Sequence, residues 1–269
     1  MAEGEVRSRR LSPIVLAAVV GGIYLGCLWG APHLRLPWPG LALVLSLLLF
    51  IGLALALTAA LVQVPLKGPS LGLGLVLCAG LWALAWRGEA RPLANLLLIL
   101  TAIFFGRSVA GLVREPNLLL PVLATAAVVD LWGVYYGPVA KVVQRAPEVI
   151  QQMAAQAPVF RPPTAGGTPL VPLVGVGDFI FLAILLSCVY RFEMNVRGTL
   201  GWAAALTFGG LMGVSFLPIR LPGLVFMGLA GVLANWQHFR FSREEKFALL
   251  YAGGLLAGVL GLLWWLWRG

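Results

Sequence analysis

The chain has 269 residues, of which 60% are hydrophobic and only 11% are charged. Soluble globular domains carry roughly 25% charged residues, so this composition excludes that class and predicts an integral membrane protein. The net charge is +9, but the 19 lysines and arginines are scattered between apolar runs instead of clustering on one face. They are typical of residues that set membrane topology, and no nucleic-acid partner is expected.

Apolar runs along the chain predict about nine transmembrane helices, because a helix needs about 20 mainly apolar residues to cross a bilayer. The runs cover residues 12–31, 40–64, 71–86, 92–113, 117–136, 170–190, 199–216, 221–236 and 246–267. The expected fold is therefore an all-α, polytopic helical bundle. The first run follows the basic sequence RSRR and lacks a convincing cleavage site, so we interpret it as a retained helix.

Cysteines and histidines give no sign of a disulfide, a metal site or a cofactor. Cys27, Cys78 and Cys188 all lie inside apolar runs, where a thiol is usually a small buried hydrophobic group. His33 and His238 are far apart in the chain, near the ends of their runs. We therefore expect neither a metal ion nor a cofactor.

The connection between the fifth and sixth runs, residues 137–169, is unusually long for this chain. Four apolar residues recur in it at near-helical spacing and predict an amphipathic helix on the bilayer surface: Val142, Val149, Ile150 and Met153. Prolines and glycines at 162–167 then end any helix. The segment is interpreted either as a tether or as a mobile gate over a site.

Only two aspartates occur in the chain, Asp130 and Asp178, and both fall inside apolar runs. A carboxylate costs several kcal/mol to place in a bilayer and is functional there by default. The runs that hold them are consecutive and therefore antiparallel, so both depths are measured from one membrane face. The helical rise places Asp130 roughly 9 Å and Asp178 roughly 12 Å from that face. We expect the two carboxyl groups to meet.

Two carboxyl groups that meet in a medium of low dielectric constant cannot readily ionise together, so they share one proton. This state suits aspartic protease chemistry, in which the ionised partner takes a proton from water and the protonated partner polarises the scissile carbonyl. Gly175 and Gly177, which precede Asp178, let another backbone approach and leave room for water.

Three segments resemble the presenilin and signal peptide peptidase family of intramembrane aspartyl proteases. The sequence GVGDFIF, residues 175–181, resembles the family's G-x-G-D signature. The segment VVDLWGVYYGPVAKVV is similar to the other catalytic helix, although Val129 stands where the family usually has tyrosine. LPGL, near residue 222, resembles the Pro-Ala-Leu tripeptide with glycine in place of alanine.

The resemblance implies a protease that hydrolyses peptide bonds in transmembrane proteins or peptides within the lipid bilayer. The residues that it implies are catalytic Asp130 and Asp178 and, for substrate binding, Gly175, Val176, Gly177, Pro222, Gly223 and Leu224. Residues 1–116 are then scaffold helices that offer substrate access, and residues 117–269 are the catalytic helices. The family usually has five or more spans before its first aspartate, whereas four are expected here, and one extra span follows the tripeptide. The need for accessory subunits stays open.

Two alternative functions are considered. A prepilin-peptidase-like protease also uses a G-x-G-D aspartate, but a lysine usually follows it, whereas Phe179 does so here. A proton- or cation-coupled transporter also uses paired acids, and it predicts inverted repeats and further polar groups along a path. The further polar candidates for such a path are Arg107 and Asn195, and both side chains can reach the membrane–water interface. The arginine-rich composition indicates a GC-rich prokaryotic genome and hence the inner (plasma) membrane.

Overall fold

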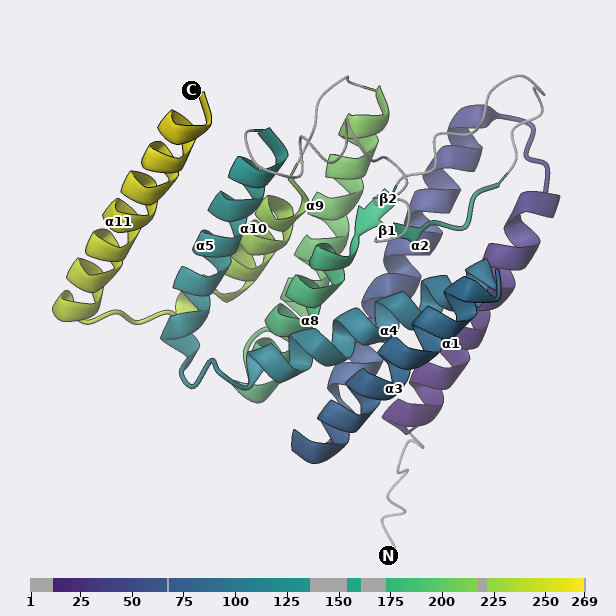
Figure 1. Ribbon diagram of the computed structural model, residues 1–269, viewed down its shortest axis with the longest axis horizontal. Helices are drawn as coiled ribbons and strands as arrows, with labels where there is room; N and C mark the ends of the chain where they lie inside the picture. The colour runs from purple at the N-terminus through teal and green to yellow at the C-terminus, as the bar shows by residue number, and fades with distance from the viewer. Residues whose placement is uncertain (1–11, 67, 136–153, 161–172, 217–221, 269) are drawn as a thin grey trace, which may run out of the picture.

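A computed structural model of the chain describes residues 12–66, 68–135, 154–160, 173–216 and 222–268. These residues form nine α-helices and one small antiparallel sheet, drawn in Figure 1. The helices are α1 (Pro13–Gly30), α2 (Pro39–Val62), α3 (Gly68–Arg87), α4 (Arg91–Ala110), α5 (Pro116–Tyr135), α8 (Val176–Arg191), α9 (Val196–Phe216), α10 (Gly223–Asn235) and α11 (Arg243–Arg268). The sheet pairs β1 (Ala154–Gln156) with β2 (Leu173–Gly175).

Each helix falls on one of the apolar runs, so the predicted helical bundle is confirmed at this level. Five helices, α1 to α5, are long and apolar enough to cross a membrane. By contrast, α8 has 16 residues and α10 has 13, fewer than the roughly 20 that a straight span needs. The count of nine spans stays a prediction.

Large apolar side chains cover the outer faces of several helices. No residue of α3 is buried, and Leu73, Val76 and Leu84 of this helix are each more than 60% exposed. Several hydroxyl groups inside helices bond back to their own helix, as Ser46 does to the Ala42 carbonyl and Thr58 does to the Ala54 carbonyl. Exposed apolar helix faces, together with hydroxyl groups that are hydrogen-bonded within their own helix, suggest a membrane protein.

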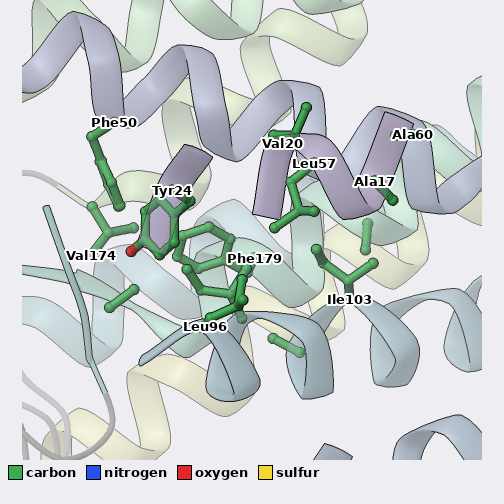
Figure 2. Packing of buried hydrophobic residues seen from close by; sticks show 14 of the residues in the cluster. Ala17, Val20, Tyr24, Phe50, Leu57, Ala60, Leu96, Ile103, Val174 and Phe179 are labelled. Carbon is green, nitrogen blue, oxygen red and sulfur yellow. The ribbon is translucent and has the colours of Figure 1, made fainter. Parts of the chain in front are cut away.

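Helix α8 lies at the centre of the bundle and joins two hydrophobic clusters. Phe179 and Ala183 of α8 pack with α1, α2 and α4, and Figure 2 shows Tyr24, Val174 and Phe179 gathered in this cluster. The other face of α8 packs with α5 and α10. At Gly106 of α4 a Cβ would lie 2.8 Å from the Ala183 Cβ and would also strike the Ile180 carbonyl oxygen, so only glycine allows this close approach.

Helix α10 lies close to α5, α8 and α9, and glycines let it do so. A Cβ at Gly231 would lie 2.8 Å from Leu185 of α8 and 2.9 Å from Leu123 of α5. A Cβ at Gly210 of α9 would lie 2.8 Å from the ring of Phe226. Because α10 packs so closely, the position of its first turn is determined by three neighbouring helices.

Helix α11 lies at one edge of the bundle, beside α5 (Figure 1). Ser242 and Glu245 cap its start, because the Glu245 N–H donates to the Ser242 hydroxyl and the Ser242 N–H donates to the Glu245 carboxylate. Asn117 of α5 bonds both the N–H and the carbonyl of Arg240. These contacts connect the preceding loop and the first turn of α11 to the beginning of α5.

The described part of the sixth apolar run begins as a strand and not as the predicted helix. Residues 173–175 are a strand, and α8 begins only at Val176 after the extended Gly175, whose φ is −62° and ψ is 148°. The prediction that Asp178 lies roughly 12 Å along a helix is therefore wrong, since it is the third residue of α8. The physical reason is pairing with β1, a strand that the sequence did not indicate. The predicted surface helix, with Val142, Val149, Ile150 and Met153, lies outside the described residues.

Candidate active site

Asp130 lies five residues before the end of α5 at Tyr135, and its side chain reaches the start of α10. The Leu224 backbone N–H donates a hydrogen bond of 2.9 Å to Oδ2 of Asp130. Leu224 is the second residue of α10, where a backbone N–H has no partner within the helix. A carboxylate suits this position, because the partial charge at a helix N-terminus is positive.

Asp178 belongs to the first turn of α8 and also faces the start of α10. The Gly175 backbone N–H is hydrogen-bonded to its carboxyl group, in the way that an acid at the third position of a helix reaches back to the residue before the helix. On the other side, a Cβ placed on Gly223 would lie only 2.5 Å from Oδ1 of Asp178. The Gly223 backbone therefore lies directly against this carboxyl group.

The two acids therefore meet at the first turn of α10, Asp130 at Leu224 and Asp178 at the neighbouring Gly223. The carboxyl groups are close enough for their charges to interact. Pro222 is buried and directly precedes α10, with a φ of −71°. Since the proline ring restricts φ near this value, the backbone that contacts both acids enters the helix in a restricted conformation.

Two adjoining cavities open beside Asp178. One has an empty volume of about 340 Å³ and is lined mainly by apolar residues of α2 and α8, among them Phe50, Ala54 and Leu182. The other has an empty volume of about 460 Å³ and lies between α8, α9 and α10, with Gly223 in its wall. Val174, Asp178, Thr207 and Met227 line both cavities. Asp178 therefore faces this space, whereas Asp130 lines neither cavity.

The remaining residues of the expected site are only partly gathered at the acids. Gly177 is exposed, and no described atom lies within 4 Å of a Cβ built on it, so the space beside it is open. Val176 packs against the cluster around Tyr24 and lines neither of the two cavities. Gly175, Pro222, Gly223 and Leu224 all lie at the two helix starts that hold the acids.

The structure places further polar residues near the site that the sequence interpretation missed. Thr207 of α9 lines both cavities. Asn95 of α4 and Tyr24 of α1 bind the backbone of Gln156 in β1. The sequence offered one signal for Asn95, which is a polar amide inside the apolar run 92–113. Its connection to the site could not be predicted, because it passes through the sheet and forms only in the tertiary structure.

Arg107 and Asn195, the polar residues considered for a transport path, are bonded to backbone groups. The Arg107 guanidinium donates to the carbonyls of Leu61 and Val64 at the end of α2. The Asn195 side chain accepts from the Gly198 N–H at 2.9 Å and thus caps α9. Within the described residues, both side chains therefore form hydrogen bonds with backbone groups at helix ends.

Comparison with known proteins gives no relative: no protein-family model, no curated protein and no solved structure matches the chain.

Proposed function

We propose that the chain is a multi-pass intramembrane aspartyl protease, with about nine spans in the inner membrane of a prokaryote, that hydrolyses peptide bonds in transmembrane segments of other proteins. One observation carries the proposal. The only two aspartates of the chain approach the same helix start from two different helices, and one of them opens onto adjoining cavities. The G-x-G-D resemblance at residues 175–178 agrees with it.

The proposed reaction uses the two carboxyl groups with one proton between them. The ionised carboxylate takes a proton from a water molecule as its oxygen attacks the scissile carbonyl carbon, and the protonated partner donates to the carbonyl oxygen. The tetrahedral intermediate collapses when its C–N bond breaks: the first carboxyl group gives the proton that it took from water to the leaving nitrogen, and the former carbonyl oxygen returns its proton to the partner carboxylate. One water molecule is consumed, and a carboxylic acid and an amine are released.

The substrate segment must unwind locally before cleavage, because a helical carbonyl is already hydrogen-bonded and shielded. The surroundings of the acids offer groups to an extended chain. Gly175 and Gly177 are exposed, and among the described strands β2 pairs only with β1, so no described strand covers its other edge. In this proposal the apolar cavity beside Ala54 holds a side chain next to the scissile bond.

The test is to purify the chain and the variants Asp130→Asn and Asp178→Asn, and to measure cleavage of a membrane-embedded model peptide by mass spectrometry. Each variant keeps the shape of the side chain but loses the carboxyl group. Each should therefore cleave at a rate that is lower than that of the wild type by a factor of about 100 or more. Glu115→Gln is the matched control, because it makes the same chemical change at an exposed residue in the turn before α5. Wild-type cleavage rates in either aspartate variant would overturn the proposal.

A second measurement separates proteolysis from ion transport. Liposomes that contain the protein are assayed for proton flux and for binding of a peptide in which a hydroxyl-bearing carbon replaces the scissile carbonyl. A protease should bind this mimic of the tetrahedral intermediate in competition with substrate. Proton flux without such binding would favour a carrier.

A further inference from the structure

The side-chain amide of Asn95 pairs with the backbone of Gln156 as a neighbouring strand would. Its Oδ1 accepts from the Gln156 N–H at 3.1 Å, and its Nδ2 donates to the Gln156 carbonyl at 3.0 Å. Asn95 is only 8% exposed and lies in the first half of α4. A single buried amide therefore satisfies both backbone groups of one strand residue.

Two further side chains bind the same segment from other helices. The Tyr24 hydroxyl of α1 donates to the Gln156 carbonyl at 2.8 Å and accepts from Asn95 Nδ2 at 3.2 Å. Ser46 of α2 accepts from the Phe160 N–H at 3.1 Å. These contacts are all made to the backbone of residues 154–160, so they fix where this segment runs and do not depend on its side chains.

The sheet connects this attachment to the acid pair. In its register Gln156 lies opposite Leu173, Ala155 opposite Val174 and Ala154 opposite Gly175. Gly175 ends β2, directly precedes α8 and bonds the Asp178 carboxyl group. A continuous set of backbone contacts thus runs from Asn95 through β1 and β2 to the residue that holds Asp178.

We infer that Asn95 is a positioning residue for the acid pair: by pairing with Gln156 it holds the β1–β2 sheet, and through Gly175 it sets the place of the Asp178 carboxyl group at the start of α10. The kinetic part of this inference rests on the proposed function. The structural part does not, because the sheet and its contacts exist whatever reaction the acids perform.

The structural part is tested by cross-linking that needs no enzyme activity. Cysteines replace Ala155 and Val174, which face each other across the sheet, in a chain whose native cysteines are changed to alanine: Cys27, Cys78 and Cys188. Disulfide formation under mild oxidant reports how often the strands are paired. It should be at least several-fold slower when Asn95→Leu is added, and unchanged when Thr101→Val is added. Thr101 is the matched control, because it lies on α4 and, within the described part of the chain, its hydroxyl bonds its own helix at the Leu97 carbonyl.

The kinetic part uses Asn95→Leu, Tyr24→Phe and Thr101→Val in the native-cysteine chain. Asn95→Leu should lower kcat by about 10- to 100-fold, since a displacement of about 1 Å of a reacting group has an effect of this size. Tyr24→Phe should have a smaller effect, because Asn95 still bonds Gln156. The peptide mimic of the tetrahedral intermediate should bind Asn95→Leu at full stoichiometry but more weakly. A loss of folded protein would instead lower the stoichiometry and leave the affinity unchanged.

The two proposals fail in different ways. If the double-cysteine chain cross-links at the same rate with and without Asn95→Leu, the inference is overturned, and this result does not depend on the function of the chain. Slow cross-linking in Asn95→Leu together with wild-type kcat would overturn the link from the sheet to the acid pair. Absence of any cleavage by the wild-type chain would refute the proposed function and leave the structural part standing.

Discussion

At Gly223 the missing side chain provides the space that the Asp178 carboxyl group occupies. A Cβ there would lie 2.5 Å from Oδ1 of this acid, closer than nonbonded atoms approach, and 3.1 Å from its Cγ, which is a tight contact. The next residue, Leu224, donates its N–H to Asp130. Substitution at one glycine can therefore move one acid of the pair while the backbone contact of the other remains.

Under the proposed function, Gly223→Ala is predicted to lower cleavage activity without unfolding the chain, because Asp178 must rotate away from the added methyl group. The expected loss is about 10-fold or more in kcat, since the reacting groups no longer lie at their original separation. Gly209→Ala is the control, as no described atom lies within 4 Å of a Cβ at this position of α9. Thermal unfolding followed by circular dichroism should show both variants folded. A fully active Gly223→Ala would mean that the contact with Asp178 is not needed.

Some features of the site follow from residue types alone. Two aspartates placed in apolar runs indicate functional acids, because the bilayer makes such residues costly. The role of Gly223 does not follow, since it depends on how α10 approaches α8. Asn95 was missed for a similar reason, because its partner Gln156 is distant in sequence and lies in a strand that forms only through tertiary pairing.

At the scale of elements, the close packing of α4 on α8 supports the helix that carries Asp178. Gly106 is a point of very close approach, opposite the Ile180 carbonyl and the Ala183 side chain. Both partners are parts of a helix whose inner residues are largely buried, so neither can shift easily. The same contact also connects α8 to the N-terminal helices.

Gly106→Ala is predicted to destabilise the protein by about 1–3 kcal/mol, the usual effect of adding atoms to a well-packed interior. Gly80→Ala on α3 makes the same change where no described atom lies within 4 Å, and it should leave stability unchanged or slightly higher. Unfolding monitored by tryptophan fluorescence in detergent would measure both. If the two variants unfold alike, α4 and α8 are not packed as closely as described.

The positions of the helices could be predicted from the apolar runs, because length and composition decide whether a segment is helical in lipid. Residues 12–31, for example, contain the whole of α1. The start of α8 could not be predicted this way. Residues 173–175 are apolar and suit either a helix or a strand, and the choice depends on pairing with residues 154–156.

At the scale of the whole molecule, the outer faces of the bundle are apolar on many helices. Val76 on α3 is 68% exposed and Leu250 on α11 is 70% exposed. In water such faces would drive aggregation, whereas in a bilayer they contact lipid. The proposed setting in a membrane explains why so little of α3 and α11 is covered.

A cysteine placed at Val76 is predicted to be protected from a water-soluble maleimide in lipid nanodiscs, where both membrane faces are open to solvent. A cysteine at Glu115, exposed in the turn before α5, should react readily. Both are made in the chain without native cysteines, and labelling after denaturation gives the maximum. Equal labelling of the two positions in nanodiscs would contradict a lipid-facing α3.

The acids are held by a third helix, since Asp130 bonds Leu224 and Asp178 packs against Gly223. Successive residues of a helix are about 1.5 Å apart along its axis. An axial shift of α10 by about this distance would break both contacts in one step and separate the carboxyl groups from their common support. In the proposed enzyme, catalytic competence would then depend on the axial position of one short helix, which the close packing at Gly210 and Gly231 holds in place.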